Sequence, residues 1–248
     1  MQKNYRRTLI ACYLGFITQA ITANFAPLLF LKLHADYGIS LGRIALIPTV
    51  FFLTQLVVDV LCAKYVDAIG YRPAVIGSSV ASAAGLIGLA FLPELTGDPF
   101  TGILISVVIY AIGSGLIEAV VSPIVEACPF EHKEAVMSLL HSFYCWGSVG
   151  VALLSTLFFA ALGVDNWRWL ACLWALVPLF NLYNFATCPI EHLVEEGKGM
   201  SMRQLFIAPL FWVAVLLMVP GHMMPTEKPH ITQPASPSAG LGDSEASR

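Results

Sequence analysis

The sequence has little charge: only 12% of its 248 residues are Asp, Glu, Lys or Arg, and the formal net charge is −3. Average protein composition includes about 25% charged residues, so this chain has too few charged side chains to cover a water-facing surface. Hydrophobic side chains make up 57% of the residues, and the mean hydropathy is +0.75. This composition predicts an integral membrane protein.

Several sequence motifs typical of soluble enzymes and nucleic-acid-binding proteins are also missing. The six cysteines are scattered, without CxxC spacing or a His cluster at metal-ligand spacing, so we expect no metal or other cofactor. There is no Gly-rich phosphate loop and no nucleophile elbow, and the net charge gives no indication of a nucleic-acid partner. A membrane-embedded enzyme using Glu118 and His141 would need a metal triad or an activated nucleophile, and neither spacing appears. We therefore expect that the chain is not an enzyme.

Long apolar runs are what the sequence has instead. A helix of about 20 apolar residues crosses the hydrocarbon core of a bilayer, which is about 30 Å thick. The runs do not alternate between polar and apolar residues, so they predict helices rather than the strands of a barrel. The fold class is therefore an all-α membrane protein with the lipid bilayer as its partner. Six spans are predicted, at residues 8–31, 44–63, 73–92, 101–125, 137–162 and 167–187.

The Lys and Arg residues between these spans predict the orientation. Eight lie on one side of the membrane and three on the other, and cytoplasmic loops carry the excess of such residues. The N-terminus is therefore expected in the cytoplasm of a multi-pass protein of the plasma or inner membrane. No small-residue cleavage site follows the first charged residues, so the first apolar run is interpreted as a retained helix. The eight are Lys3, Arg6, Arg7, Lys64, Arg72, Lys133, Lys198 and Arg203, and the three are Lys32, Arg43 and Arg168.

An internal repeat is indicated by two short segments. ITANFAP at 21–27 and IEAVVSP at 117–123 share Ile, Ala and Pro at the same spacing, 96 residues apart. The same offset superposes the first three spans on the last three. Three helices per repeat give the two repeats opposite topology, as in many secondary transporters. The predicted architecture is thus a 3+3 inverted repeat.

Glu118 lies near the middle of an otherwise apolar span, in GSGLIEAVVSP. A carboxylate at that depth costs about 2.5–3.5 kcal/mol on insertion scales, so it usually faces a bundle interior or a water-filled cavity. Small neighbours, among them Gly115 and Ser122, admit close helix approach, and Pro123 frees a backbone carbonyl near the acid. Such a carboxyl suits a group that gains and loses a proton. The alternative interpretation is a protonated Glu that only bonds a neighbouring helix.

Other polar side chains in the spans are candidates for binding a solute. His141, Tyr144 and Trp146 lie in HSFYCWG of the fifth span and combine hydrogen-bonding tips with flat apolar faces, as a sugar ring requires. Gln19 and Asn24 supply uncharged amides from the first span. We expect these side chains to line a central polar cavity with the buried acid. Packing or interfacial anchoring is the alternative for the aromatic residues and the histidine.

The second span carries a further polar pair. Gln55 and Asp59 lie one helical turn apart on the same face. We interpret Asp59 as a structural residue that pairs with Lys64 or with a neighbouring helix end.

The loop AKYVDAIGYRP resembles the cytoplasmic signature loop of the major facilitator superfamily. Asp67, Gly70 and Arg72 match the Asp, the Gly and the basic residue of that signature, and the resemblance implies a conformational gate there. Ala63 stands where a Gly is usual, and Ala68 replaces a basic residue.

The fourth-span motif GSGLIEAVVSP and the fifth-span segment HSFYCWG resemble those of the fucose permease family of sugar:proton symporters. The resemblance implies a secondary transporter that takes up a sugar or similar small polar solute with protons. It also implies that Glu118 binds both solute and proton, and that His141 and Tyr144 face the sugar. Relatives carry an acid in the first span where this chain has residues 22–24, Thr-Ala-Asn. Either Glu118 carries the proton alone, or transport here is not proton-driven.

The end of the sequence differs from the six-span region. We predict a six-helix bundle at 1–188, a cytoplasmic loop at 189–204, a partial seventh helix at 205–219 and a disordered Pro/Ser/Gly-rich tail at 220–248. Because the superfamily has two six-helix halves around one site, three interpretations are open. The chain is a truncated transporter, a half-transporter that pairs with another half or a second copy, or an accessory membrane protein whose polar residues only fasten helices together. The abrupt change in composition near Pro220 favours the first.

Overall fold

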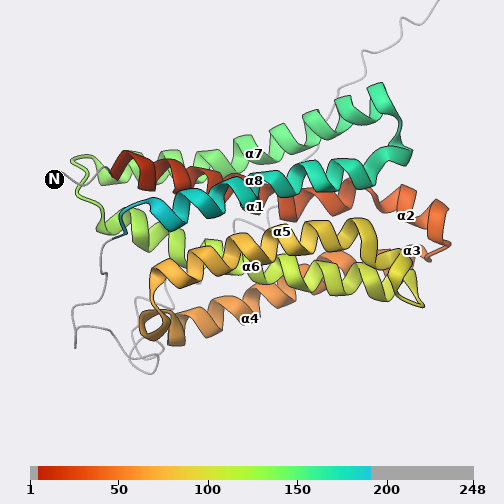
Figure 1. Cartoon of the computed structure of the whole chain (residues 1–248), viewed down its shortest axis with the longest axis horizontal. Helices are drawn as coiled ribbons and strands as arrows, with labels where there is room; N and C mark the ends of the chain where they lie inside the picture. The colour runs from red at the N-terminus through yellow and green to blue at the C-terminus, as the bar shows by residue number, and fades with distance from the viewer. Residues whose placement is uncertain (1–4, 191–248) are drawn as a thin grey trace, which may run out of the picture. The chain divides into compact units, whose positions relative to one another are not determined.

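The computed structural model describes residues 5–190 of the chain. Apart from Pro189 and Ile190, the predicted loop, partial seventh helix and tail lie outside the described residues, and their boundaries stay predictions. The described part consists of helices joined by short loops and turns (Figure 1). Its elements are α1 Tyr5–Leu28, α2 Phe30–Tyr37, α3 Leu41–Ile44, α4 Leu46–Ile69, α5 Tyr71–Leu95, α6 Pro99–Ala127, α7 Lys133–Leu162, the 3₁₀ turn η1 Val164–Asn166, and α8 Trp167–Thr187.

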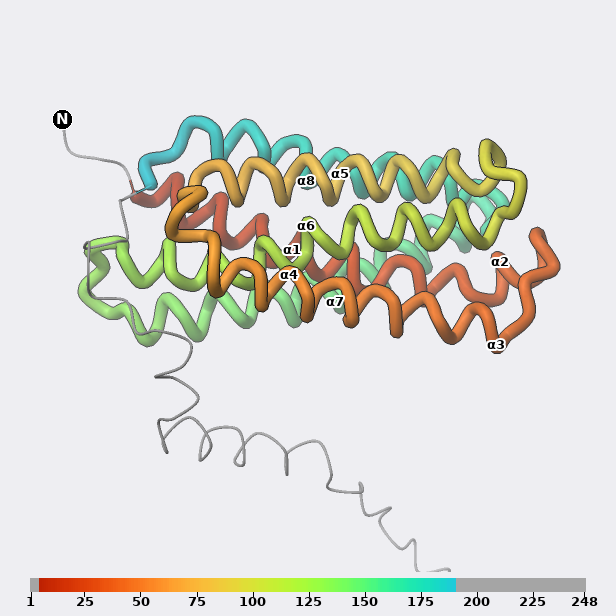
Figure 2. The backbone as a smooth tube through the Cα atoms, turned by 90° about the horizontal axis from the view of Figure 1, so that it is seen from below, coloured from red at the N-terminus to blue at the C-terminus, as the bar shows by residue number. Residues whose placement is uncertain are grey.

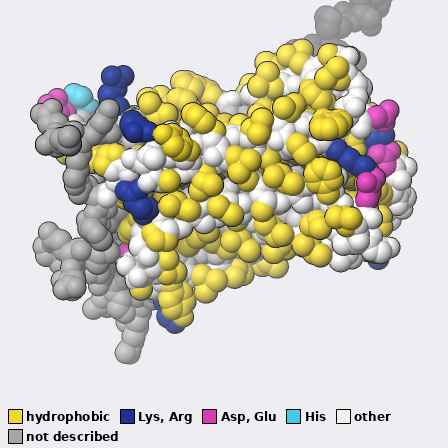
Figure 3. Space-filling model, viewed as in Figure 1, with side chains coloured by type: hydrophobic (Ala, Val, Ile, Leu, Met, Phe, Trp, Pro, Cys, Tyr) yellow, Lys and Arg dark blue, Asp and Glu magenta, His cyan; other side chains and the backbone are white. Residues whose placement is uncertain are grey.

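Six of these segments are long and apolar enough to cross a membrane, namely α1, α3 with α4, α5, α6, α7, and η1 with α8. The predicted all-α membrane fold with six spans is therefore confirmed. Figure 3 shows hydrophobic side chains over the middle of the bundle, with Lys, Arg, Asp and Glu near its two ends. That distribution fits a bundle surrounded by lipid.

Several helix ends differ from the expected spans, and two of these differences have a clear local cause. The first span was expected to run to residue 31, but α1 ends at Leu28, one residue after Pro27, and α2 begins after a break at Leu29. Proline lacks an N–H and its ring crowds the preceding turn, so the helix cannot continue regularly. The second span was expected to end at residue 63, but α4 continues to Ile69 and stops at Gly70. The helix thus extends beyond its apolar part into the polar signature loop.

Close backbone contact joins α5 to α6, the two helices that pack most extensively. A Cβ atom added to Gly85 would lie 2.5 Å from Tyr110 N, and one added to Gly113 would lie 2.6 Å from Ser78 O. Both distances are shorter than real Cβ contacts. Small residues at such a crossing allow dispersion contacts along the whole interface, which is how helices associate when lipid removes the hydrophobic driving force.

Two other helix contacts are related as the expected repeat requires. α1 packs along α7, and α4 packs along α6. The repeat relates α1 to α6 and α4 to α7, because each pair lies three spanning helices apart in the chain. It therefore relates the α1–α7 contact to the α6–α4 contact, in agreement with a 3+3 arrangement. The least covered spans are α7 and the α3–α4 segment, with 11% and 22% of their most apolar windows buried, against 61% for α1. Figure 2 shows α4 and α7 along the same side of the bundle, so that side presents two apolar helix faces.

At one end of the bundle, here called the Arg72 end, α8 is fastened to its neighbours. The Arg72 guanidinium donates to the carbonyl oxygens of Phe185, Ala186 and Cys188 at 3.2, 2.9 and 2.8 Å. The last carbonyls of a helix have no partners within the helix and carry its partial negative charge. A cation placed there satisfies both needs and holds α5 to α8.

At the opposite end, ion pairs fix α2 against the bundle. Lys32 pairs with Asp36, 2.7 Å away, and with Asp165 of η1, and the hydrogen bond with Asp165 raises the pKa of Lys32. Arg168 of α8 pairs with Glu94 of α5 and donates to the Tyr37 hydroxyl at 3.0 Å. The short helix that follows the Pro27 break is therefore tied to the η1–α8 segment, and through Arg168 to α5.

The close α5–α6 contact predicts a strong effect of a single methyl group. Gly113→Ala places a carbon against the α5 backbone, so we expect it to lower the free energy of unfolding by about 1–3 kcal/mol, the usual cost of overpacking. Gly77→Ala is the matched control, because a Cβ atom at Gly77 on α5 meets nothing within 4 Å. Thermal unfolding of both variants in lipid nanodiscs measures the difference. Equal midpoints for the two variants would contradict the close contact.

Arg72 is expected to act structurally within this bundle. Arg72→Met removes its three hydrogen bonds to the end of α8, and hydrogen bonds to a charged group contribute about 1.5–3 kcal/mol. We expect a lower unfolding midpoint and faster amide exchange at residues 185–188. Arg6→Met, at an exposed position of α1, serves as the control and should leave both unchanged. Unaltered exchange in Arg72→Met would contradict the capping role.

Candidate functional site

A polar cavity opens between four of the spanning helices. It has a volume of about 370 Å³ and lies on the side of the bundle where α4 and α7 are exposed. None of the described residues that line it is a Lys or an Arg. Its wall consists of Phe16, Gln19 and Ala23 of α1, Phe51, Phe52 and Gln55 of α4, Glu118 and Ser122 of α6, and His141, Tyr144 and Cys145 of α7.

Glu118 occupies this cavity and is held by two amides from different helices. Gln19 Nε2 of α1 donates to Glu118 Oε2 at 2.8 Å, and Gln55 Nε2 of α4 donates to the same oxygen. Hydrogen bonds to an ionised carboxylate are about twice as strong as neutral ones. The Gln19 side chain is only 6% exposed, and its Oε1 is buried without a hydrogen-bond partner among the described residues. The carboxylate thus joins three helices through one oxygen.

The α7 wall carries the two polar residues expected from the sequence. His141 lies against Phe16 of α1, with ring centroids 5.2 Å apart in an edge-to-face arrangement. Tyr144 lies one turn further along α7 and lines the same cavity. Ser122, four residues after Glu118 on α6, adds a hydroxyl. The cavity therefore combines a carboxylate, two amides, hydroxyl groups and an imidazole with aromatic faces, a set that can orient a small polar molecule.

Two of the six expected binding residues lie elsewhere. Asn24 Nδ2 donates to Ala20 O at 2.8 Å and to Ser148 Oγ at 3.1 Å, which joins α1 to α7 outside the cavity. Trp146 is 60% exposed and lies in a separate apolar groove with Phe143 and Trp174. Each residue along a helix turns by about 100°, so Trp146 and Tyr144 face different surroundings although they are two positions apart.

Our sequence-based set left out two polar residues of this site, Ser122 and Gln55, of which Gln55 bonds the acid. The sequence did single out Gln55, because an amide side chain in an apolar span is as unusual at this position as at Gln19. Gln55 also lies one turn from an acid. The acid itself, Asp59, does not form the expected bond with Lys64 within the described chain. Lys64 Nζ instead lies over the Tyr65 ring, 4.9 Å from its centroid, and Asp59 Oδ1 is buried without a hydrogen-bond partner among the described residues.

The three signature-loop residues lie at the Arg72 end, away from the cavity. Gly70 links α4 to α5 with φ of +94°, a conformation that favours glycine. Asp67 accepts a hydrogen bond from the Tyr71 hydroxyl at 3.0 Å across this turn. Arg72 is bound to the end of α8, as described above.

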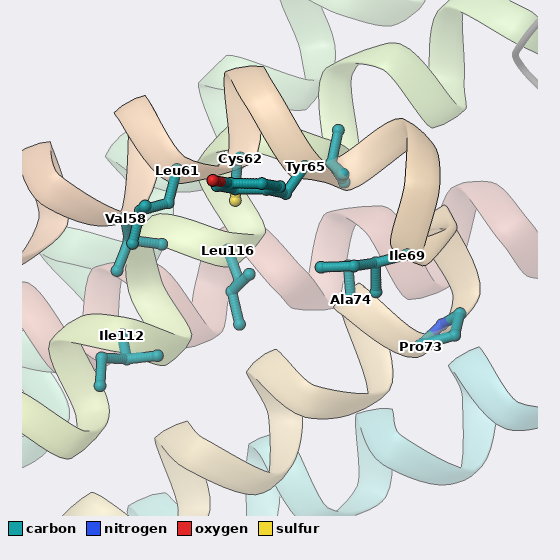
Figure 4. Close-up of a pocket in the computed structure, with 10 residues that line it drawn as sticks. Val58, Leu61, Cys62, Tyr65, Ile69, Pro73, Ala74, Ile112 and Leu116 are labelled. Atoms are coloured by element: carbon teal, nitrogen blue, oxygen red, sulfur yellow. The ribbon is translucent and has the colours of Figure 1, made fainter.

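A second cavity, of about 410 Å³, is lined almost wholly by apolar atoms of α4, α5 and α6 (Figure 4). Its wall includes Val58, Leu61 and Tyr65 of α4 and Leu116 of α6. It offers few groups that could orient a polar solute, so the smaller polar cavity is the better candidate site.

Solved structures of membrane transporters have a similar fold. The inward-open xylose transporter XylE from E. coli is 16% identical, with a TM-score of 0.68 over 91% of this chain and 58% of its own. A structure of the proton:xylose symporter XylE bound to 6-bromo-6-deoxy-D-glucose is 15% identical, with a TM-score of 0.67 over 75% of this chain and 45% of its own. The peptide transporter POT in complex with sulfate is 15% identical, with a TM-score of 0.62 over 89% and 48%. At this identity the likeness shows the fold alone.

The chain spans about half the length of these transporters. No curated protein sequence matches it. The sequence model of the Major Facilitator Superfamily, however, matches residues 11–227, which is most of the chain. Six apolar helices and this match agree with the fold and the family expected from the signature loop. The chain belongs to the Major Facilitator Superfamily, a family of membrane transporters.

Proposed function

We propose that the chain forms one half of a proton-coupled transporter that takes up a sugar or a similar small polar solute. The observation that carries this proposal is Glu118, a carboxylate held by Gln19 and Gln55 in a polar cavity between spanning helices. A charged group at such depth is costly and commonly marks a solute or ion pathway. The structural neighbours include a proton:xylose symporter, which supports a small polar solute and protons as ligands.

In this proposal Glu118, Gln19, His141 and Tyr144 bind the solute, and Gln55 joins them. Both amides bond Glu118 Oε2, which leaves Oε1 to accept a hydroxyl of the solute. The lack of Lys and Arg in the described wall disfavours an anionic solute, and the aromatic faces favour a ring. Asn24 and Trp146 lie outside the proposed site.

Glu118 also carries the coupled proton in this proposal. Proton binding neutralises the carboxylate, which removes most of the cost of enclosing the site in a low-dielectric surrounding. The bundle can then close around a neutral, occupied cavity. Proton release on the opposite side of the membrane restores the negative charge of Glu118, and the next transport cycle can begin.

A second six-helix half completes the pathway in our proposal. The cavity opens on the side of α4 and α7, whose apolar faces are poorly covered. Alternating access rocks one half against the other around such a site. We propose that another half or a second copy of the chain covers these faces, with the Arg72 end and the N-terminus in the cytoplasm. Asp67, Gly70 and Arg72 then form the gate at that end, where Arg72 keeps α5 and α8 together.

A second candidate function is favoured by the same contacts. Glu118 and its two amides are mutually paired, and such pairing also suits an accessory membrane protein in which polar groups only fasten helices. The two functions differ in what they require of the carboxylate. Fastening needs hydrogen bonds alone, whereas proton-coupled transport needs a group that changes its charge.

Glu118→Gln separates the two functions, because it keeps the size and hydrogen bonding but cannot titrate. We expect proton-driven accumulation to fall to background, and solute binding to weaken about tenfold or more, since a charged hydrogen-bond partner contributes about 1.5–3 kcal/mol. Uptake of radiolabelled D-xylose by vesicles containing the full chain, with an imposed pH gradient, measures this. Other neutral sugars serve as further probes.

Trp146→Phe, outside the cavity, is the control and should keep the wild-type accumulation. Equal accumulation by the wild type and Glu118→Gln would reject proton coupling through this residue. If the wild type neither binds nor accumulates any probe, and Glu118→Gln retains the wild-type unfolding midpoint, the fastening function is favoured instead.

A further inference from the structure

An apolar groove lies between α4 and α5 at the Arg72 end of the bundle, and it is the 410 Å³ cavity described above (Figure 4). The two helices are consecutive in the chain, yet they pack on each other far less than each packs on α6. The space between them is closed at the back by Ile112 and Leu116 of α6. Leu61 and Ile69 of α4 are 50% and 62% exposed, so the groove opens on the outside of the bundle.

The groove is separate from the polar cavity. On α6, Leu116 lines the groove and Glu118 lines the polar cavity. Residues two positions apart on a helix differ by about 200° in direction, so the two openings lie on different sides of α6. Between them α4 meets α6 closely, because a Cβ atom added to Gly115 would lie 2.9 Å from Val58 Cβ. A molecule in the groove therefore leaves the proposed solute site free.

The dimensions of the groove match one leaflet of a bilayer. Its α4 wall runs from Val58 to Ile69, which is about 16 Å along the helix axis. The hydrocarbon core of a bilayer is about 30 Å thick, so one leaflet contributes about 15 Å. The wall offers almost no hydrogen-bonding group, which makes water a poor occupant and an acyl chain a suitable one.

A lysine lies at the rim of this apolar groove. Lys64 Nζ is placed over the ring of Tyr65, 4.9 Å from its centroid, and Tyr65 lines the groove. Lys64 has no acidic partner among the described residues. The other charged groups of this turn are engaged, Asp67 by the Tyr71 hydroxyl and Arg72 by the carbonyls at the end of α8. The Lys64 ammonium is therefore available to an anion outside the protein.

We propose that the groove binds an anionic glycerophospholipid, with one acyl chain between α4 and α5 and the phosphate at Lys64. The apolar part of α4 was expected to end at residue 63, which places Lys64 at the level of the lipid headgroups. An anionic lipid is favoured over a zwitterionic one, because the ammonium of a zwitterionic headgroup repels Lys64. The bound chain fills the space between α4 and α5 and so supports α4. This inference does not depend on the proposed function.

Photoactivatable lipids test the site in phosphatidylcholine vesicles that contain the full chain. The anionic probe is phosphatidylglycerol with a diazirine on its acyl chain, the zwitterionic probe is phosphatidylcholine with the same group, and peptide mass spectrometry locates the adducts. We expect phosphatidylglycerol adducts at residues 58–74 and 112–116 to exceed those at the exposed Leu173 and Leu176 of α8 about fivefold. Phosphatidylcholine should label the groove about fivefold less than phosphatidylglycerol.

Two substitutions separate the charge from the shape of the groove. Lys64→Gln should abolish the preference for phosphatidylglycerol, whereas Arg6→Gln, which removes another exposed charge at the same end of the bundle, should retain it. Ile112→Trp fills the back of the groove and should remove the adducts at residues 58–74 with either probe. Ile105→Trp is its control, because Ile105 lies two turns away on α6 with a similar exposure, 43% against 37%, and does not line the groove.

Equal labelling of the groove by the two probes in the wild type would overturn the proposal. Labelling of the groove no stronger than that of α8 would count against it in the same way. Protection of the groove from both probes would reject a lipid as the occupant and indicate that another protein surface covers it. Lys64→Gln changes only an exposed side chain, so the test remains decisive even if Ile112→Trp fails to fold.

Discussion

The hydrogen bonding of one carboxylate inside a membrane bundle is the constraint on which the site depends. Glu118 must have donors at a depth where lipid supplies none, and the bundle provides Gln19 and Gln55 from two other helices. This requirement fixes how α1, α4 and α6 are turned toward one another. The polar cavity, its aromatic wall and the exposed side along α4 and α7 all follow from that common orientation.

Hydropathy was sufficient to predict the six spanning helices, because length and apolar composition are what a bilayer demands of a helix. The signature loop was sufficient to predict the family, and family membership confirms that the chain is not an enzyme. The placement of Glu118, Gln19, His141 and Tyr144 around one cavity agrees with the sequence-based expectation, although their roles in binding stay proposals. These residues stand out because polar side chains are rare in apolar helices.

Helix rotation is what the sequence did not reveal. Asn24 and Trp146 have suitable chemistry, but their positions on α1 and α7 turn them to a helix contact and to an outer groove. Gln55 was passed over because its partner lies 63 positions away, and only packing of α4 on α6 brings the two together. The length of α4 was also underestimated, since its last turns are polar and leave the apolar span before they reach Gly70.

The backbone contact between α5 and α6 has a consequence for how this sequence can evolve. At Gly85 and Gly113 the interhelical space holds no further carbon atom, so selection there accepts glycine almost alone. Along the outer face of α8, by contrast, Leu173 and Leu176 are at least half exposed, and other apolar side chains of many sizes fit equally well. We therefore expect substitutions to accumulate slowly at the α5–α6 contact and quickly among the exposed apolar side chains. New partners can then arise on the exposed faces without disturbing the fold.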